Sequence, residues 1–155
     1  CVAVGVYGLF YATRAVIPAM KRQKSGCILN ISSNAGRHGL PDRSPYVASK
    51  WAIIGMTKTL AMELGGFGVR ANAICPGSVE GERIDRIIRN DAAGRGASTE
   101  EVRAEYLRQS SLRQFARAED VAAAALFLAS PAGARISGQV IGVDGHTETL
   151  GRIGG

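Results

Sequence analysis

Apolar side chains recur along this chain with two different periods. Between residues 2 and 22, and again between residues 46 and 64, they are spaced three and four residues apart, which predicts two amphipathic helices. Spacing and helix-start signals predict three further helices: residues 82–91, a helix beginning after Ser98, and residues 119–129. Since Glu101 stands three residues after Ser98, we expect that helix to begin with a capping box.

Three short apolar runs, bounded by glycine, proline or aspartate, predict β-strands: residues 27–31, 69–75 and 139–143. Short strands that alternate with helices imply right-handed crossovers and a parallel sheet covered on both faces. The expected fold class is therefore α/β, a three-layer, Rossmann-like doubly wound parallel sheet. The strand at residues 27–31 has no upstream strand to pair with, and a bare apolar edge promotes aggregation. We therefore expect residues 1–155 to form one partial domain whose N-terminal, mononucleotide-binding half is missing.

The composition, with 46% hydrophobic and 21% charged residues, is typical of a soluble globular protein. The net charge of +6 arises mainly in residues 1–79, whereas acids and arginines balance over residues 80–113. The densest basic group, at residues 21–24, stands at the end of a predicted helix, where cations interact favourably with the helix dipole. No aromatic-rich basic stripe accompanies it, so we expect no nucleic-acid binding.

The cysteines and the apolar stretches exclude further kinds of site. Cys1, Cys27 and Cys75 have the spacing of neither a disulfide nor a metal site, so we expect small buried hydrophobes in a reducing, cytoplasmic compartment. The chain has only two histidines, so we also expect no bound metal. Glycine, proline and charged residues interrupt the apolar stretches, so we expect no transmembrane helix and no membrane partner.

The strongest candidate chemistry lies on the second predicted helix. Tyr46 and Lys50 are four residues apart and therefore share one helix face. Ser33 ends the preceding strand, thirteen residues before Tyr46, and Pro76-Gly77 ends the next strand. Because ligands bind at the carboxyl ends of parallel strands, we expect these residues to converge on one crevice.

These side chains suit proton transfer at a carbinol–carbonyl centre. A phenol exchanges protons poorly at neutral pH, and a neighbouring ammonium stabilises the phenolate. The Ser33 hydroxyl can hydrogen-bond the substrate oxygen, whereas Ser32 can satisfy backbone groups at the strand end. The hydride of such a reaction requires a cofactor, because no protein side chain supplies it.

The motifs together resemble the second, C-terminal catalytic half of the short-chain dehydrogenase/reductase family. They follow the family's order and spacing over essentially the whole chain: Ile31-Ser32-Ser33-Asn34-Ala35-Gly36, Tyr46-x₃-Lys50, Asn72-x₃-Pro76-Gly77, and Ser137-Gly138-Gln139 followed by Val143-Asp144-Gly145. The resemblance implies an oxidoreductase that uses NAD or NADP to interconvert a secondary alcohol and a ketone or other carbonyl compound.

The resemblance also implies roles for individual residues. Tyr46 would be the acid/base, Ser33 would orient the substrate, and Lys50 would tune Tyr46 and bind the nicotinamide ribose. The implied cofactor-binding residues are Tyr46, Lys50, Pro76, Gly77 and Val79, and the implied substrate-pocket residues are Ala35, Leu40 and Ser78. Asn72 would brace the strands, and Asp144-Gly145 would form a structural turn near a subunit interface of a homo-oligomer, a dimer or tetramer.

In the family, the segment at residues 80–113 forms a substrate lid. Its arginines suggest a clamp for an anionic substrate: Arg83, Arg86, Arg89 and Arg95. The equal number of acids in the segment favours instead a solvated helix face with internal ion pairs. The chain lacks the G-x-S-x-G elbow of a Ser–His hydrolase, so His38 is expected in a loop or pocket wall. His146 follows the Asp144-Gly145 turn and is expected at an interface.

Two departures from the family limit what the chain is expected to do alone. Gly5 stands where the family often has an asparagine that holds a proton-relay water. The glycine-rich phosphate loop and the residue that decides between NAD and NADP belong to the half that is absent. We therefore expect the chain alone to be inactive and to bind no nicotinamide nucleotide. The alternatives are a non-catalytic association module or, less compatible with the short C-terminal segment, an epimerase or dehydratase of the extended relatives.

Overall fold

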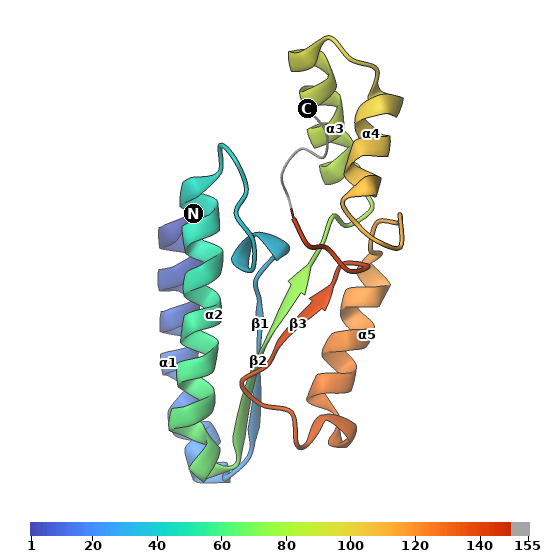
Figure 1. Ribbon diagram of the computed structural model, residues 1–155. Helices are drawn as coiled ribbons and strands as arrows, with labels where there is room; N and C mark the ends of the chain where they lie inside the picture. Colours follow the sequence, from blue (N-terminus) through green and yellow to red (C-terminus); the bar gives the residue numbers. More distant parts are fainter. Residues whose placement is uncertain (150–155) are drawn as a thin grey trace.

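A computed structural model describes residues 1–149 and has a parallel three-stranded sheet at its centre (Figure 1). The strands are β1 (Gly26–Ile31), β2 (Val69–Pro76) and β3 (Val140–Val143), in the order β1-β2-β3. Gly26 is opposite Val69, and Ala73 is opposite Val140. All three predicted strands are confirmed, each to within one residue at either end.

The predicted helices are confirmed as well. The structure has η1 (Ala3–Tyr7), α1 (Gly8–Gln23), η2 (Asn34–Gly36), α2 (Ser44–Leu64), η3 (Gly65–Phe67), α3 (Glu82–Arg95), α4 (Thr99–Arg108), α5 (Ala118–Ala129) and η4 (Pro131–Gly133). The first helix begins with a π-helical turn, η1. The helix predicted over residues 82–91 is longer in the structure: α3 continues to Arg95 and stops at Gly96, whose φ of 64° allows the left-handed turn.

The hydrophobic core lies between the sheet and the helix pair α1 and α2. Its buried members are Ile28, Leu60, Leu64, Val69 and Ala71. These side chains come from β1, β2 and the second half of α2, and α1 adds Ile17 and Met20 at the margin. The sheet is thereby fixed against α2, the helix that carries the predicted catalytic pair.

The helix α5 covers the opposite face of the sheet (Figure 1). Ile28 packs against α2, whereas the Cys27 thiol donates to the carbonyl oxygen of Leu128 in α5 at 3.7 Å. Consecutive strand residues point to opposite faces, so α2 and α5 lie on different sides. The connections β1–α2–β2 and β2–α5–β3 each move the chain by one strand in the same direction across the sheet. Because their helices cover opposite faces, the two crossovers have opposite hands.

The expectation that every crossover is right-handed is therefore wrong for one of the two. The preference for the right hand arises when a strand feeds a helix that packs directly back onto the sheet. Between β2 and α5 the chain first forms α3 and α4, beyond the carboxyl ends of the strands (Figure 1). This long excursion lets the chain enter the other face.

The first helical segment differs from expectation in its hydropathy. By length and composition, Ala3–Gln23 is apolar enough to cross a membrane, and only 6% of it is buried. Gly5, Gly8, Arg14 and Pro18 interrupt this segment, as predicted, but its mean hydropathy is still 1.3. The segment lies beside α2 and β1 and leaves large apolar side chains exposed: Val4, Tyr7, Phe10, Tyr11 and Val16.

The three cysteines are all free thiols. Cys75 is buried in β2 and Cys27 is half-buried, as expected of small hydrophobes, but Cys1 is exposed. The prediction of burial is wrong for Cys1 because it precedes the first helical turn and packs under no other element. No cluster of potential metal ligands occurs within residues 1–149.

Candidate active site

The two serines after β1 have different surroundings. Ser32 is 3% exposed, and its hydroxyl donates to the carbonyl oxygen of Lys50 at 2.8 Å. Ser33 is half-buried, and its hydroxyl oxygen accepts from the backbone N–H of Ala35 at 3.2 Å. Ser32 thus bonds a backbone group as anticipated, but one in α2 and not at the strand end. The Ser33 hydroxyl retains its proton for another acceptor.

Lys50 joins the start of α2 to the end of β1. Its Nζ donates to the carbonyl oxygen of Ile31 at 3.2 Å and lies 5.7 Å from the centre of the Tyr46 ring. Both side chains are half-buried. The structure therefore brings the Lys50 ammonium to the strand end that leads into Ser33, with the Tyr46 ring beside it.

The loop after β2 forms the next part of the crevice. The Gly77 N–H donates to the carbonyl oxygen of Val143 at 3.0 Å, and a Cβ at Gly77 would lie 3.0 Å from the Cα of Asp144. Val79 forms a parallel bridge with Ala116. The bonds of this bridge use the Ser78 carbonyl and the Glu80 N–H. Within residues 1–149, the backbone N–H of Val79 consequently remains unpaired.

The predicted substrate-pocket residues are not equally accessible. Ala35 is 1% exposed, so its side chain offers almost no surface to a substrate. Leu40 is half-buried in the loop before α2. Ser78 lines a cavity of about 20 Å³.

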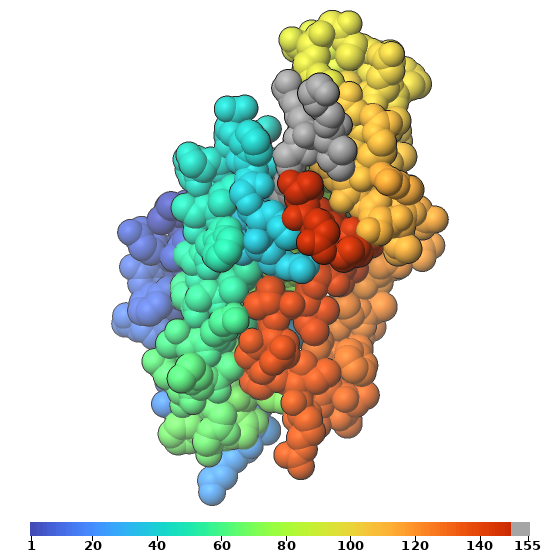
Figure 2. Space-filling view, viewed as in Figure 1, coloured from blue at the N-terminus to red at the C-terminus, as the bar shows by residue number. Residues whose placement is uncertain are grey.

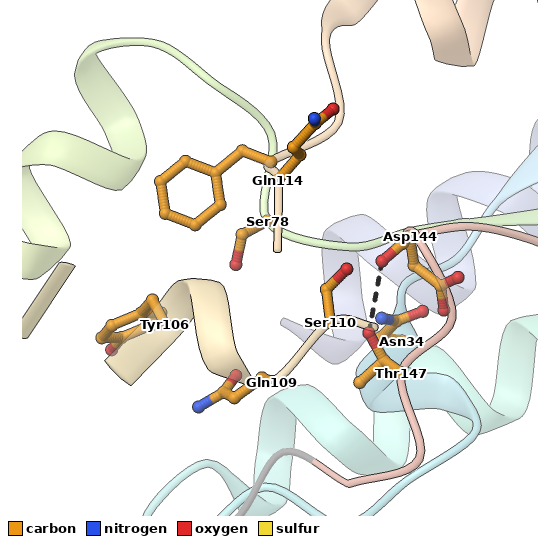
Figure 3. Close-up of a pocket in the computed structure, with 9 residues that line it drawn as sticks. Asn34, Ser78, Tyr106, Gln109, Ser110, Gln114, Asp144 and Thr147 are labelled. Atoms are coloured by element: carbon orange, nitrogen blue, oxygen red, sulfur yellow. Dashed lines mark hydrogen bonds between the residues drawn. The ribbon is translucent and has the colours of Figure 1, made fainter. Parts of the chain in front are cut away.

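This cavity lies between the strand ends and the segment that runs from α4 to α5 (Figure 3). Its walls are Asn34, Ser78, Tyr106, Gln109, Ser110, Gln114, Phe115, Asp144 and Thr147. Sequence reasoning did not single out Asn34, which immediately follows Ser33 and projects into this group of side chains. The only signal for it was its position within the Ser-Ser-Asn-Ala-Gly motif.

The helices α3 and α4 pack on one another through a separate hydrophobic cluster: Ile84, Ile88, Ala92, Val102 and Phe115. They project beyond the carboxyl ends of the strands, at the end of the molecule where the loop before α2 also lies (Figure 2). Their charged side chains are largely paired internally. Arg89 contacts Glu82 at 2.6 Å, and Arg95 contacts Glu105 at 2.7 Å.

Two of the four arginines considered for an anion clamp are thus held in ion pairs, which favours the alternative of a solvated helix face. Arg83 and Arg86 are exposed and form no ion pair within the described residues.

Residues near the chain's other motifs mainly support the loops. Asn72 accepts from the Gln139 N–H at 3.0 Å and donates to the Ile136 carbonyl at 2.8 Å, which confirms its bracing role. Asp144 contacts Arg37 of the Ser33 loop at 3.3 Å, and the Asp144 side chain is 6% exposed. The Asp144 turn is therefore tied to the loop that carries Ser33.

Three further residues that the sequence singled out are His146, His38 and Gly5. His146 is exposed, and its ring nitrogens contact Ser111 and Glu148. His38 lies in the loop after η2, and its Nε2 is buried without a partner among residues 1–149. A Cβ at Gly5 would lie 3.8 Å from the Ser49 side chain, so the position corresponding to the missing asparagine is indeed next to α2.

Comparison with known proteins agrees with this geometry. The family model described as enoyl-(acyl carrier protein) reductase matches residues 1–146. The chain is 39% identical over 142 residues to 3-oxoacyl-acyl-carrier-protein reductase from Thermotoga maritima, covering 92% of this chain and 53% of that protein. The chain thus spans about half the length of this curated relative.

Solved structures lead to the same group of proteins. Sorbitol-6-phosphate 2-dehydrogenase from Erwinia amylovora has a TM-score of 0.86 at 29% identity, covering 92% of this chain and 56% of that one. A 4-hydroxyisoleucine dehydrogenase complexed with NADH has a TM-score of 0.73 at 31% identity, with 92% and 55% covered. The chain therefore belongs to the short-chain dehydrogenase/reductase family, as its motifs had indicated.

Proposed function

We propose that this chain is the catalytic half of an NAD(P)-dependent oxidoreductase that interconverts a secondary alcohol and a ketone, with Tyr46 as the acid/base. The observation that carries the proposal is the position of Lys50. Its ammonium lies beside the Tyr46 ring and bonds the end of β1, two residues before Ser33. A phenol, a cation and a serine hydroxyl at one strand end form the set that proton exchange with a carbinol requires.

Each side chain has a distinct task in this proposal. Tyr46 donates a proton to the carbonyl oxygen in the reductive direction and accepts it from the alcohol in the other. The Lys50 ammonium stabilises the phenolate that results. The Ser33 hydroxyl donates to the substrate oxygen and holds it near the phenol. The nicotinamide cofactor, when bound, supplies or accepts the hydride.

The residues at the strand ends fit a nicotinamide nucleotide. Lys50 presents ammonium hydrogens that can bind ribose hydroxyls, together with the Tyr46 hydroxyl. Pro76 and Gly77 form the turn at the end of β2, and the unpaired N–H of Val79 offers a backbone donor of the kind that a carboxamide oxygen needs. The relatives named for 3-oxoacyl reduction, for dehydrogenation and for a complex with NADH support this reading.

We expect Tyr46→Phe to lower kcat by at least about 10²-fold, the range in which positioned acid–base groups contribute. The substitution removes one of the two groups proposed to bind the ribose and leaves Lys50 in place. The affinity for NADH, measured by fluorescence titration of the complete protein, should therefore fall by no more than about tenfold, the worth of one hydrogen bond. Ketone reduction is followed as loss of NADH absorbance.

Tyr7→Phe is the matched control, because Tyr7 is exposed on η1 and far in sequence from the crevice. The same hydroxyl is removed there, and turnover should not change. Undiminished turnover of Tyr46→Phe would contradict the assignment of the acid/base.

We also propose that residues 80–113 act as the substrate lid. Support comes from the Ser78–Glu80 segment and Ala116, which are hydrogen-bonded to one another at 2.9 Å and 2.8 Å. These bonds fix both ends of the excursion at the crevice, while its own hydrophobic cluster lets α3 and α4 move as one body.

We further propose that the protein assembles as a homo-oligomer, a dimer or tetramer, in the cytoplasm, through the exposed apolar surface of η1, α1 and α2. Val4 and Met62 are each 85% exposed, and Trp51 is 51% exposed. Apolar exposure on two neighbouring helices is typical of a surface that a further protein subunit covers.

A further inference from the structure

Asn34 is a buried polar side chain without a partner. It is 3% exposed, and neither its amide nitrogen nor its amide oxygen has a hydrogen-bond partner among residues 1–149. Buried amide groups in proteins are nearly always hydrogen-bonded, because leaving both ends unpaired forfeits their hydration without replacement. An exception beside a cavity therefore indicates something that binds there.

The cavity next to Asn34 is small and polar. Its volume of about 20 Å³ exceeds the roughly 10–15 Å³ that one water-sized group needs. Two of its hydroxyl groups donate away from the cavity: Ser110 donates to the Gly145 carbonyl at 3.0 Å, and Thr147 donates to the Asp144 carbonyl at 3.4 Å. Their oxygens consequently keep lone pairs that can accept from an occupant. Figure 3 shows these side chains grouped around Asn34.

The walls of the cavity contain no unpaired charge. No lysine, arginine or histidine lines it, and Asp144 is its one acidic wall residue. One carboxylate oxygen of Asp144 contacts Arg37 at 3.3 Å and the other accepts from the His146 N–H at 3.0 Å. Burial raises the pKa of Tyr106, so its phenol stays neutral and can donate. A carboxylate or phosphate would find no counter-charge in this cavity.

We propose that this cavity is a substrate subsite for one neutral hydrogen-bonding substituent, a hydroxyl or carboxamide, and that Asn34 is the residue that selects it. The inference rests on the proposed function and names the class of substrate that the site takes. Asn34 immediately follows Ser33, and Ser78, which follows the Pro76–Gly77 turn, lines the same cavity. The subsite therefore adjoins both strand ends at which the reacting part of the substrate is proposed to bind.

The kinetic test uses ketones of one skeleton that differ at a single terminal group: 4-hydroxy-2-butanone, 2-pentanone and 4-oxopentanoate. We expect kcat/KM of the complete protein to be at least about tenfold higher for the hydroxyl compound than for its apolar isostere. The anionic compound should be the poorest substrate. Asn34→Leu should bring the hydroxyl-to-methyl ratio close to one while 2-pentanone is still reduced.

Asn90→Leu is the matched control, because Asn90 is an exposed asparagine of α3 outside the cavity. It should leave the ratio unchanged. An unchanged ratio in Asn34→Leu would overturn the subsite while leaving the proposed function intact. Failure of the unmutated protein to reduce any ketone would instead count against the proposed function. If Asn34→Leu does not fold, Asn34→Ser, which retains a hydrogen-bonding group, should give an intermediate ratio.

A binding measurement tests the subsite without turnover. The side-chain NH₂ signals of Asn34, assigned by their loss in Asn34→Leu, are followed by NMR during titration with each of the three ketones. We expect a saturable shift with 4-hydroxy-2-butanone and none with 4-oxopentanoate. No shift with any compound, or a crystal structure at saturating 4-hydroxy-2-butanone that shows only an ordered water beside Asn34, would overturn the proposal.

Discussion

Gly36 sets how closely the Ser33 loop approaches α2. A Cβ at this position would lie 2.9 Å from the carbonyl oxygen of Lys50 and would also collide with the Ser32 hydroxyl. The contact with Lys50 is with backbone, which cannot move aside like a flexible side chain. The spacing between the Ser33 loop and the Tyr46–Lys50 pair thus depends on a residue with no side chain.

We therefore expect Gly36→Ala to destabilise the protein by about 1–3 kcal/mol, the usual cost of overpacking. Gly55→Ala is a matched control, since Gly55 is in the same α2 helix and a Cβ there meets nothing within 4 Å. This control should be neutral or stabilising by up to about 1 kcal/mol, as alanine favours helix. Chemical denaturation measures both, and equal stability of the two variants would contradict the packing argument.

At the scale of single residues, the sequence predicts the convergence of Ser33, Tyr46 and Lys50 better than the burial of Asn34. Ser33, Tyr46 and Lys50 lie on one strand end and one helix turn, so their spacing along the chain already implies that they converge. The burial of Asn34 depends instead on Gly77 and Asp144, which arrive from two later strands. Local pattern carries no information on such long-range contacts.

At the scale of the elements, hydrogen bonds from the N-cap residue, Ser98, stabilise the first turn of α4. The Ser98 side chain accepts from the Glu101 N–H at 3.2 Å, and the Glu101 carboxylate accepts from the Ser98 N–H at 3.0 Å. These bonds from Ser98 hold the pKa of Glu101 below its usual range. The predicted capping box is therefore confirmed, and it anchors the helix that supplies Tyr106 to the cavity.

We expect Ser98→Ala to lower stability by about 1 kcal/mol. Glu101→Gln should lower the melting temperature at pH 7. Since the pKa of Glu101 is depressed in the folded state, its contribution is present above the usual glutamate pKa and is lost as pH falls below it. The difference between wild type and Glu101→Gln should therefore vanish in acid. Glu100→Gln, one position earlier and outside the box, should show a smaller difference at pH 7.

The order and type of the elements follow from the sequence, because period and turn residues are local signals. The hand of the second crossover does not. It depends on where the chain returns after α3 and α4, and thus on the packing of Leu128 and Cys27 across the second face. The hydropathy of Ala3–Gln23 was underestimated for a different reason: Gly5, Gly8, Arg14 and Pro18 interrupt the segment but lower its mean hydropathy only to 1.3.

For the whole molecule, the exposed apolar surface of η1 and α1 is the feature with the clearest consequence. We expect Val4→Asp combined with Tyr11→Asp to shift the protein to a smaller species in size-exclusion chromatography with light scattering. Charges placed in an apolar interface stay unpaired and are costly to bury. Leu126→Asp, at a residue of α5 that is 72% exposed on the other side of the sheet, should leave the mass unchanged. The same mass for all variants would refute assembly through this surface.

The Arg37–Asp144 contact joins residues that are 107 positions apart in the chain. Closing so long a loop costs conformational entropy that local turns do not, so such contacts form late in folding. β1, β2 and α2 can associate while the C-terminal strand is still unplaced. The Ser33 loop then acquires its final position only when the end of β3 docks. We therefore expect the docking of β3 to be the step of folding that completes the crevice.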